Sequence, residues 1–225
     1  MDLLNEQSSV VQTHNLSKSF GKHEVLKHID FTLPRGVIYG ICGSNGIGKS
    51  VFLRILSGLI LPDQGEVVVF GKNVGKETEF APATGILIDS PGFLLANSGK
   101  RNLQLLASVS GKVTPDRIIR AIRQVGLDPE DRRPVSTYST GMRQRLGLAQ
   151  AIMEDPDLLI LDEPTNGLDF EGQKEIYSYL VELRAQGKTI LITSHSRDEL
   201  RILCDKIFIL SRGKLDQISA SESES

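Results

Sequence analysis

Residues 43–50 form a glycine-rich loop that constrains the fold of this chain more than any other feature. The loop follows an apolar run at 37–42 and precedes a helical segment, Lys49–Leu56. Its pattern, GxxxxGK[ST], is typical of a phosphate-binding loop between a strand and a helix, and predicts a nucleotide site. The loop residues are Gly43, Ser44, Asn45, Gly46, Ile47, Gly48, Lys49 and Ser50.

Each residue type in the loop has a chemical reason to be there. We expect Gly43, Gly46 and Gly48 to adopt positive φ and to let the backbone approach an oxyanion. Successive backbone N–H groups and the helix N-terminus would then hold a β-phosphate. Lys49 can reach the β- and γ-phosphates, and the Ser50 hydroxyl can ligate Mg²⁺.

Composition limits the class of protein. The 225 residues suffice for one large domain, and a net charge of −2 argues against a nucleic-acid partner. Cys42 and Cys204 form no CxxC pattern and are predicted to be buried free thiols. The segment 1–7 lacks the features of a signal peptide. No window approaches the roughly 18–20 apolar residues of a membrane span, so we expect membrane contact only through a partner.

Strand and helix patterns alternate along most of the chain, which predicts an α/β core with a mainly parallel sheet. Between about 98 and 154 only helical spacing recurs, with Thr114 and Pro115 as a helix start. We expect strands at Val10–Asn15, Glu24–Leu33, 37–42, Glu66–Phe70, Thr84–Ile88, Leu158–Leu161, Thr189–Thr193 and Lys206–Leu210. We expect subdomain helices at Leu103–Val109, Arg117–Val125 and Met142–Met153.

Two carboxylates follow the buried strand pattern Leu158–Leu161. Ligands bind at the carboxyl ends of such strands. Asp162 can hold Mg²⁺, largely through water, and Glu163 can polarise an attacking water. The alternative is that both residues only end the strand.

Three further motifs give the chain a resemblance to the ATP-binding cassette (ABC) ATPases over residues 10–217. The segment 138–145, YSTGMRQR, resembles the signature motif of that family, and 164–169, PTNGLD, resembles its D-loop. His195 resembles its switch histidine. The resemblance implies an ABC ATPase core at 8–218 with an N-terminal antiparallel β subdomain and a helical subdomain inserted at about 91–155. We expect the polar tail 219–225 to be disordered.

The resemblance also implies how ATP is shared between subunits. Ser139 suits an N-cap for a helix over Thr140–Met153, and Gly141 leaves room for an anion at its end. In ABC ATPases this end faces the γ-phosphate bound to the other subunit, so Ser139, Thr140, Gly141 and Met142 would contact ATP across a dimer. Whether the dimer has two identical chains stays open, and an ordinary capped helix is the alternative.

Two more roles follow from the family. His195 would contact the γ-phosphate and hold the water and Glu163 in line. Phe20 would stack on adenine; such stacking contributes on the order of 1–3 kcal/mol and reads little of the base, so selectivity for ATP over GTP should be weak. Core packing is the alternative for Phe20.

Two positions depart from the usual family pattern. Asp89 replaces a glutamine, and the bacitracin-resistance and lantibiotic-immunity exporters usually have glutamate there. We expect Asp89 to act near Mg²⁺ and to report the γ-phosphate to the membrane partner. Val51 replaces a threonine that contacts the α-phosphate, a loss of roughly one hydrogen bond, on the order of 1 kcal/mol.

These expectations combine into an ATPase subunit that hydrolyses ATP to ADP and phosphate, with Mg²⁺, and drives a separate transmembrane permease. We expect an exporter of antimicrobial peptides or drug-like substrates, peripheral on the inner face of the cell membrane. Phe93 and Leu94 would line the groove for the permease, with internal packing as the alternative. The rival functions are an importer ATPase, a non-transport ABC ATPase and a phosphate-loop kinase.

Overall fold

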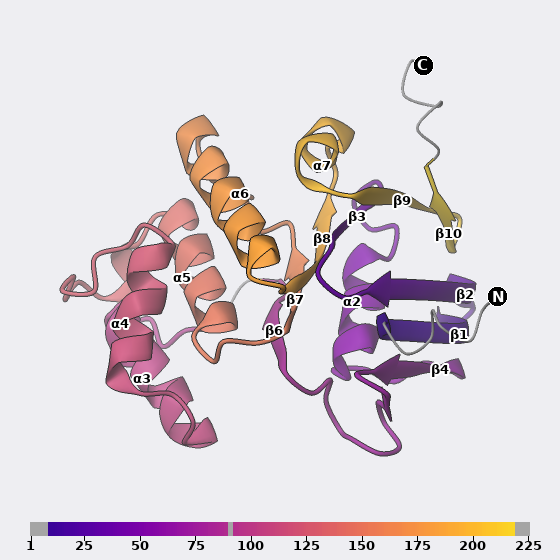
Figure 1. Ribbon diagram of the computed structural model, residues 1–225, viewed down its shortest axis with the longest axis horizontal. Coiled ribbons are helices and arrows are strands. Elements are labelled where there is room, and N and C mark those ends of the chain that lie inside the picture. Colours follow the sequence, from indigo (N-terminus) through magenta and orange to yellow (C-terminus); the bar gives the residue numbers. More distant parts are fainter. Residues whose placement is uncertain (1–8, 90–91, 219–225) are drawn as a thin grey trace.

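The computed structural model describes residues 9–89 and 92–218. The expectations for the segment 1–7, the tail 219–225 and the boundary at residue 91 lie outside these ranges. Figure 1 shows an antiparallel sheet, a parallel-rich sheet with helices around it, and a group of helices at the opposite end from the antiparallel sheet. The fold is therefore the mixed α/β arrangement that the sequence predicted.

The central sheet has six strands in the order β10-β9-β3-β8-β7-β6. All neighbours are parallel except β10 and β9, which form an antiparallel pair at one edge. β3 and β7 are almost wholly buried, as continuous apolar runs require. The strands are β3 (Ile38–Cys42), β6 (Thr84–Leu87), β7 (Leu158–Asp162), β8 (Thr189–Ser194), β9 (Lys206–Ser211) and β10 (Lys214–Gln217).

A second sheet of four antiparallel strands has the order β2-β1-β4-β5. Its members are β1 (Ser9–Phe20), β2 (His23–Pro34), β4 (Gln64–Val69) and β5 (Lys72–Asn73). Helix α2 (Lys49–Ser57) lies beside this sheet in Figure 1, and buries Phe52, Leu53 and Leu56 in a cluster to which both sheets contribute. The helix that starts at the phosphate loop is thus fixed between two layers.

The other apolar cluster joins the far face of the central sheet to the helices. α3 (Gly99–Ser110), α4 (Pro115–Gln124) and α5 (Thr140–Ile152) form the group at one end of the molecule, with a 3₁₀ turn at Val135–Thr137 before α5. α6 (Phe170–Ala185) and α7 (Arg197–Leu203) precede β8 and β9. No helix within the described ranges is both long enough and apolar enough to cross a membrane.

Two side-chain expectations, for Phe93 and for Cys204, are corrected. Phe93 is only 8% exposed and packs in the helical core, so the alternative of internal packing holds for it. Leu94 and Leu95 are the exposed pair, each at 57%. Cys42 is a buried free thiol as expected, but Cys204 is only partly buried.

Candidate functional site

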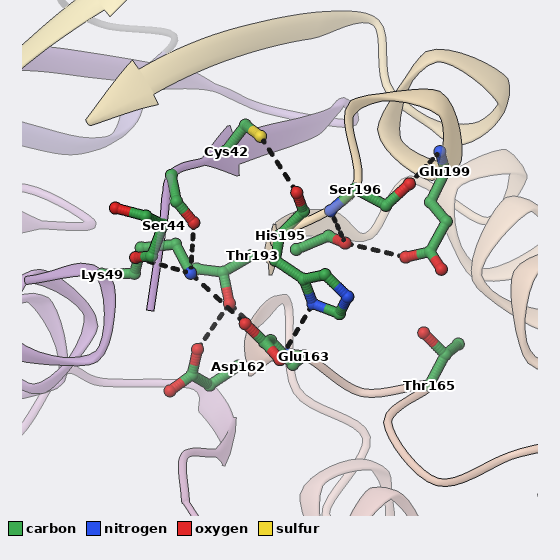
Figure 2. A network of polar contacts seen from close by, with 12 residues as sticks. Cys42, Ser44, Lys49, Asp162, Glu163, Thr165, Thr193, His195, Ser196 and Glu199 are labelled. Atoms are coloured by element: carbon green, nitrogen blue, oxygen red, sulfur yellow. Dashed lines mark hydrogen bonds and ion pairs between the residues drawn. The ribbon is translucent and has the colours of Figure 1, made fainter. Parts of the chain in front are cut away.

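Three neighbouring strands bring the predicted site residues together at one edge of the central sheet. β8 lies between β3 and β7, so Cys42 is level with Ser194, and Asp162 with Thr193. The phosphate loop leaves β3, Glu163 follows β7, and His195 follows β8. Segments more than a hundred residues apart therefore meet where parallel strands end (Figure 2).

The phosphate loop exposes its backbone as predicted, with one correction. Gly46 and Gly48 have φ of 75° and 117°, but Gly43 does not adopt positive φ. A Cβ on Gly43 would lie 2.9 Å from the Leu210 carbonyl oxygen, so this glycine is needed for close packing on β9. Gly48 caps α2 without a side-chain hydrogen bond, which leaves the first-turn amides for an anion.

Lys49 is held inside the loop, and its side chain is 5% exposed. Its Nζ donates to the Gly43 carbonyl oxygen at 2.7 Å and to the Ser44 carbonyl oxygen at 3.4 Å. Nζ also lies 3.3 Å from Glu163 Oε1. The ammonium group of Lys49 is therefore surrounded by oxygen atoms. The oxygen atoms of a phosphate would join these partners or replace some of them.

Ser50 and Asp162 form the predicted metal pair. The Ser50 hydroxyl donates to Asp162 Oδ2 at 2.5 Å. A hydroxyl and a carboxylate supply the hard oxygen ligands that suit Mg²⁺, and Mg²⁺ usually takes its remaining ligands from water and phosphate. Within residues 9–89 and 92–218, no group of three or more His, Cys, Asp or Glu side chains forms a metal site. The pair thus fits a metal ion that arrives with a nucleotide.

Glu163 joins Lys49 to His195. Its Oε2 lies 3.4 Å from His195 Nδ1 while its Oε1 faces Lys49, and the side chain is 22% exposed. Figure 2 shows this carboxylate between the two basic side chains. Of the three residues that we predicted to be catalytic, Glu163 therefore contacts both Lys49 and His195.

The loop that carries His195 is anchored by short-range hydrogen bonds. Ser194 Oγ donates to Glu199 Oε2 at 2.7 Å and accepts from the Ser196 amide at 2.9 Å. The Cys42 thiol lies 3.8 Å from the His195 carbonyl oxygen. The imidazole itself is 62% exposed, so its backbone is fixed while its ring can reach a ligand.

Thr193 and Gln144 were not predicted from the sequence, although both touch Glu163. The Thr193 hydroxyl accepts from the Glu163 amide at 3.0 Å and donates to Asp162 Oδ1 at 2.5 Å. Gln144 Nε2 donates to the Glu163 carbonyl oxygen at 3.0 Å. The available signal for Thr193 was a polar residue near the end of an apolar strand, two residues before His195, and for Gln144 it was a place in the signature segment 138–145.

Many of these groups line a cleft of about 510 Å³; Gly43, Ile47, Thr193 and His195 are not among its lining residues. The predicted site residues that line it are Ser44, Asn45, Gly46, Gly48, Lys49, Ser50, Val51, Asp89, Asp162 and Glu163. Three further residues also line it: Val25, Gln144 and Asn166. Phe20 does not line the cleft. Its side chain is 52% exposed at the end of β1, with Lys18 Nζ 5.7 Å from the ring centre, which rules out core packing.

Asp89 borders the cleft but is paired elsewhere. Its carboxylate Oδ2 accepts from Arg54 Nε at 3.1 Å and also binds the second guanidinium nitrogen of Arg54. Asp89 has a φ of 59°, a left-handed conformation that side chains other than glycine adopt at a cost. Arg54, one turn before the end of α2, is thus a partner of Asp89 that the sequence did not predict.

Four residues of the signature segment do not line the cleft, although Gln144 of the same segment does; the four are Ser139, Thr140, Gly141 and Met142. The Ser139 hydroxyl accepts from the Met142 amide at 3.1 Å and caps α5 as predicted. Gly141 packs on the D-loop, where a Cβ would lie 3.0 Å from the Gly167 carbonyl oxygen. Ser139 and Thr140 are exposed, whereas Gly141 is buried. The capped end of α5 therefore has exposed residues beside its cap, and the cleft has no contribution from them.

A phosphate loop, a carboxylate pair and a switch histidine at the end of one parallel sheet define a phosphate-loop nucleotide hydrolase. Residues 26–166 match the ABC transporter family model. The chain is 41% identical over 216 residues to the bacitracin transport ATP-binding protein BcrA of Enterococcus faecalis, covering 95% of this chain and 70% of that protein.

Other relatives agree with this match. The lantibiotic transport ATP-binding protein SrtF of Streptococcus pyogenes is 35% identical, covering 92% of this chain and 89% of that protein. A dimeric bacterial ABC transporter cassette superposes with a TM-score of 0.82 at 21% identity, over 91% of this chain and 96% of that one, which supports the fold.

The chain belongs to the ABC transporter family. ATP hydrolysis coupled to transport is general for this family, and its cassettes bind ATP and ADP. The chain is therefore the ATP-binding and ATP-hydrolysing subunit of an ABC transporter, which acts with a separate transmembrane partner.

Proposed function

We propose that this subunit hydrolyses ATP with Glu163 as the group that activates water. The observation that carries the proposal is the position of the Glu163 carboxylate, between Lys49 Nζ at 3.3 Å and His195 Nδ1 at 3.4 Å. ATP would place its γ-phosphate beside Lys49, where the loop amides hold the β-phosphate. Glu163 would then face the outer side of the γ-phosphate, from which water attacks in line.

The reaction is a substitution at phosphorus. The water oxygen forms a bond to Pγ while the bond from Pγ to the bridging oxygen of ADP breaks, and the water proton passes toward Glu163. His195 holds the Glu163 carboxylate and the γ-phosphate in the relative position that the attack requires. Ser50, Asp162 and Asp89 are the residues that would hold Mg²⁺, directly or through water, and the bound ion neutralises phosphate charge. Phe20 would stack on adenine, and Val51 would lie by the α-phosphate.

The second half of each site would come from another chain. Ser139, Thr140, Gly141 and Met142 do not line the cleft, yet the capped N-terminus of α5 can hold an anion. Two chains arranged head to tail would place this end on the γ-phosphate of the partner. We propose such a dimer, with residues 8–218 as the ATPase domain and about 91–155 as the inserted subdomain.

The transported molecule is proposed from the relatives. Proteins named for bacitracin and lantibiotic transport are 35–41% identical, and Asp89 stands where such exporters have an acidic residue. We propose export of antimicrobial peptides or similar compounds, with the subunit on the inner face of the membrane. Leu94 and Leu95, both exposed beside the helical subdomain, would contact the permease.

Replacing Glu163 by glutamine tests the proposal. Glu163→Gln keeps the size of the side chain but cannot take a proton, so ATP should bind and stay uncleaved. We expect hydrolysis to fall by about 10²–10³-fold, and an ATP-bound dimer to accumulate in light-scattering chromatography. Glu182→Gln, on the exposed face of α6, is the control. Hydrolysis by Glu163→Gln at the native rate would contradict the proposal.

A further inference from the structure

Glu163 has a backbone conformation that it does not adopt without support. Its φ is 45°, in the left-handed region where a side chain crowds the neighbouring carbonyl oxygen. A glycine would adopt this conformation freely, but a glycine has no carboxylate to offer. Neighbouring groups must therefore stabilise the conformation at this position.

Two side chains provide this support from opposite ends of the residue. Thr193 is fully buried on β8, and its hydroxyl accepts a hydrogen bond from the Glu163 amide at 3.0 Å. Gln144, on α5, donates to the Glu163 carbonyl oxygen at 3.0 Å, and the Asn166 amide donates to the same oxygen at 3.0 Å. Both backbone groups of Glu163 are therefore held by groups distant in the sequence or by the D-loop turn.

The Thr193 hydroxyl can donate its hydrogen to only one of its two partners. Because the Glu163 amide must be a donor, the hydroxyl accepts from it and donates its own hydrogen to Asp162 Oδ1 at 2.5 Å. Asp162 Oδ2 then remains on the side of Ser50. One hydroxyl thus sets both the orientation of the Asp162 carboxylate and the position of the Glu163 backbone.

We propose that Thr193 and Gln144 are positioning residues that hold Glu163 in its left-handed conformation and so aim its carboxylate between Lys49 and His195. This inference rests on the role of Glu163 given under the proposed function. Gln144 also ties Glu163 to α5, the helix that begins beside Ser139.

The test separates the rate of hydrolysis from nucleotide binding. Thr193→Val keeps the shape of the side chain and removes the hydroxyl, so kcat should fall at least about tenfold. The Kd for a fluorescent ATP analogue (mant-ATP), measured without Mg²⁺ so that the orientation of Asp162 does not enter, should stay within about threefold, because the phosphate loop is untouched. Thr193→Ser should restore kcat to within about threefold of the native value. Gln144→Met should lower kcat by only about three- to fivefold, since the Asn166 amide still binds the carbonyl oxygen.

Two control variants match these changes. Thr189→Val, at the other end of β8, removes an equally buried hydroxyl that binds the Gly36 amide at 2.9 Å. Gln150→Leu alters α5 away from Glu163, beside α3 and β6. We expect both controls to keep the native kcat, with thermal unfolding measured for every variant. If Thr193→Val does not fold, Gln144→Met against Gln150→Leu decides the question.

The possible outcomes are distinct. The proposal is overturned if Thr193→Val and Gln144→Met keep the native kcat, or if Thr193→Val loses no more kcat than Thr189→Val. Glu163→Gln, assayed in parallel, isolates the underlying assumption. If Glu163→Gln hydrolyses ATP normally, the proposed role of Glu163 fails; if it is inactive while the Thr193 and Gln144 variants are native, only the positioning role fails.

Discussion

The two ends of the nucleotide site differ in how they are built. Around the phosphate loop, side chains from the start of α2, from β7 with Glu163 after it, and from β8 are joined by hydrogen bonds and ion pairs, and Lys49 is 5% exposed. At the signature motif, a single hydroxyl caps α5, and Ser139 and Thr140 are exposed. In the first region the polar side chains are already oriented without a ligand. In the second region the helix amides are not enclosed by other side chains.

This difference indicates what each region does alone. A polar network that satisfies its own groups can bind a phosphate with little rearrangement, since its donors are already oriented. A capped helix end without other contacts binds an anion weakly, because its charge is screened by water and salt. The N-terminus of α5 at the signature motif therefore binds an anion more tightly only when another surface, such as a second chain, excludes water from it.

The largest effect is expected from variants that damage one region each. Lys49→Ala should reduce ATP hydrolysis about 10²–10³-fold, and Ser139→Arg, which blocks the helix end with a cation and bulk, should do the same. In a head-to-tail dimer, mixing the two variant chains creates one site with both defects and one with neither. The mixture should recover roughly a quarter of the native activity, because half of the dimers are mixed and each has one intact site.

Steady-state ATPase assays of the mixture at varied ratios measure this recovery. Lys72→Ala, on the exposed strand β5, is the control for loss of a lysine. A mixture no more active than the two variants added together would mean that the signature does not complete a site on another chain. The difference between the two regions would then have another cause.

Sequence reasoning was strongest where function is encoded locally. The phosphate loop, the carboxylates after β7 and the cap of α5 are each contiguous, and their backbone chemistry follows from residue type and spacing. The mainly parallel sheet followed from alternating strands and helices, and the resemblance to the ABC ATPases placed His195 beside Glu163, as the structure has them.

Contacts between distant segments were beyond the sequence. Arg54 and Asp89 are 35 residues apart, and Gln144 and Glu163 are 19 apart, and no pattern in the sequence pairs the members of either contact. Phe93 lies in an apolar loop whose burial depends on the packing of α3 against its neighbours, so pattern alone left docking and packing open. Gly43 was assigned positive φ because its motif suggested it, whereas contact with β9 is the physical reason for glycine there.

A smaller effect is expected at the edge of the cleft, where Asp89 binds Arg54. Asp89→Ala should raise the Mg²⁺ concentration for half-maximal hydrolysis by about five- to tenfold, because one oxygen ligand, direct or through water, is lost. Arg54→Met should shift the requirement the other way, since the carboxylate is released from its ion pair. ATPase activity measured over a Mg²⁺ titration checks both.

The opposite signs make this pair of variants informative. A shift in the same direction for both would mean that the ion pair itself, and not the free carboxylate, supports the site. An unchanged Mg²⁺ requirement in Asp89→Ala, together with unchanged transport by the assembled exporter, would remove Asp89 from the metal site. The network around the phosphate loop would then end at Ser50 and Asp162.

The smallest effect should come from adding a hydrogen bond to the region that is already well organised. Val51→Thr keeps the branched shape of the side chain and places a hydroxyl at the start of α2, on the wall of the cleft. If this hydroxyl binds the α-phosphate, nucleotide affinity should rise about fivefold, which corresponds to about 1 kcal/mol. Equilibrium binding of mant-ATP measures the change, while kcat should stay near its native value because Val51 lies away from the γ-phosphate end.

The same exchange at Val181, exposed on α6, is the control. A gain no larger than that of Val181→Thr would mean that the loop amides already satisfy the phosphates, and that further improvement of the site has to come from the signature side.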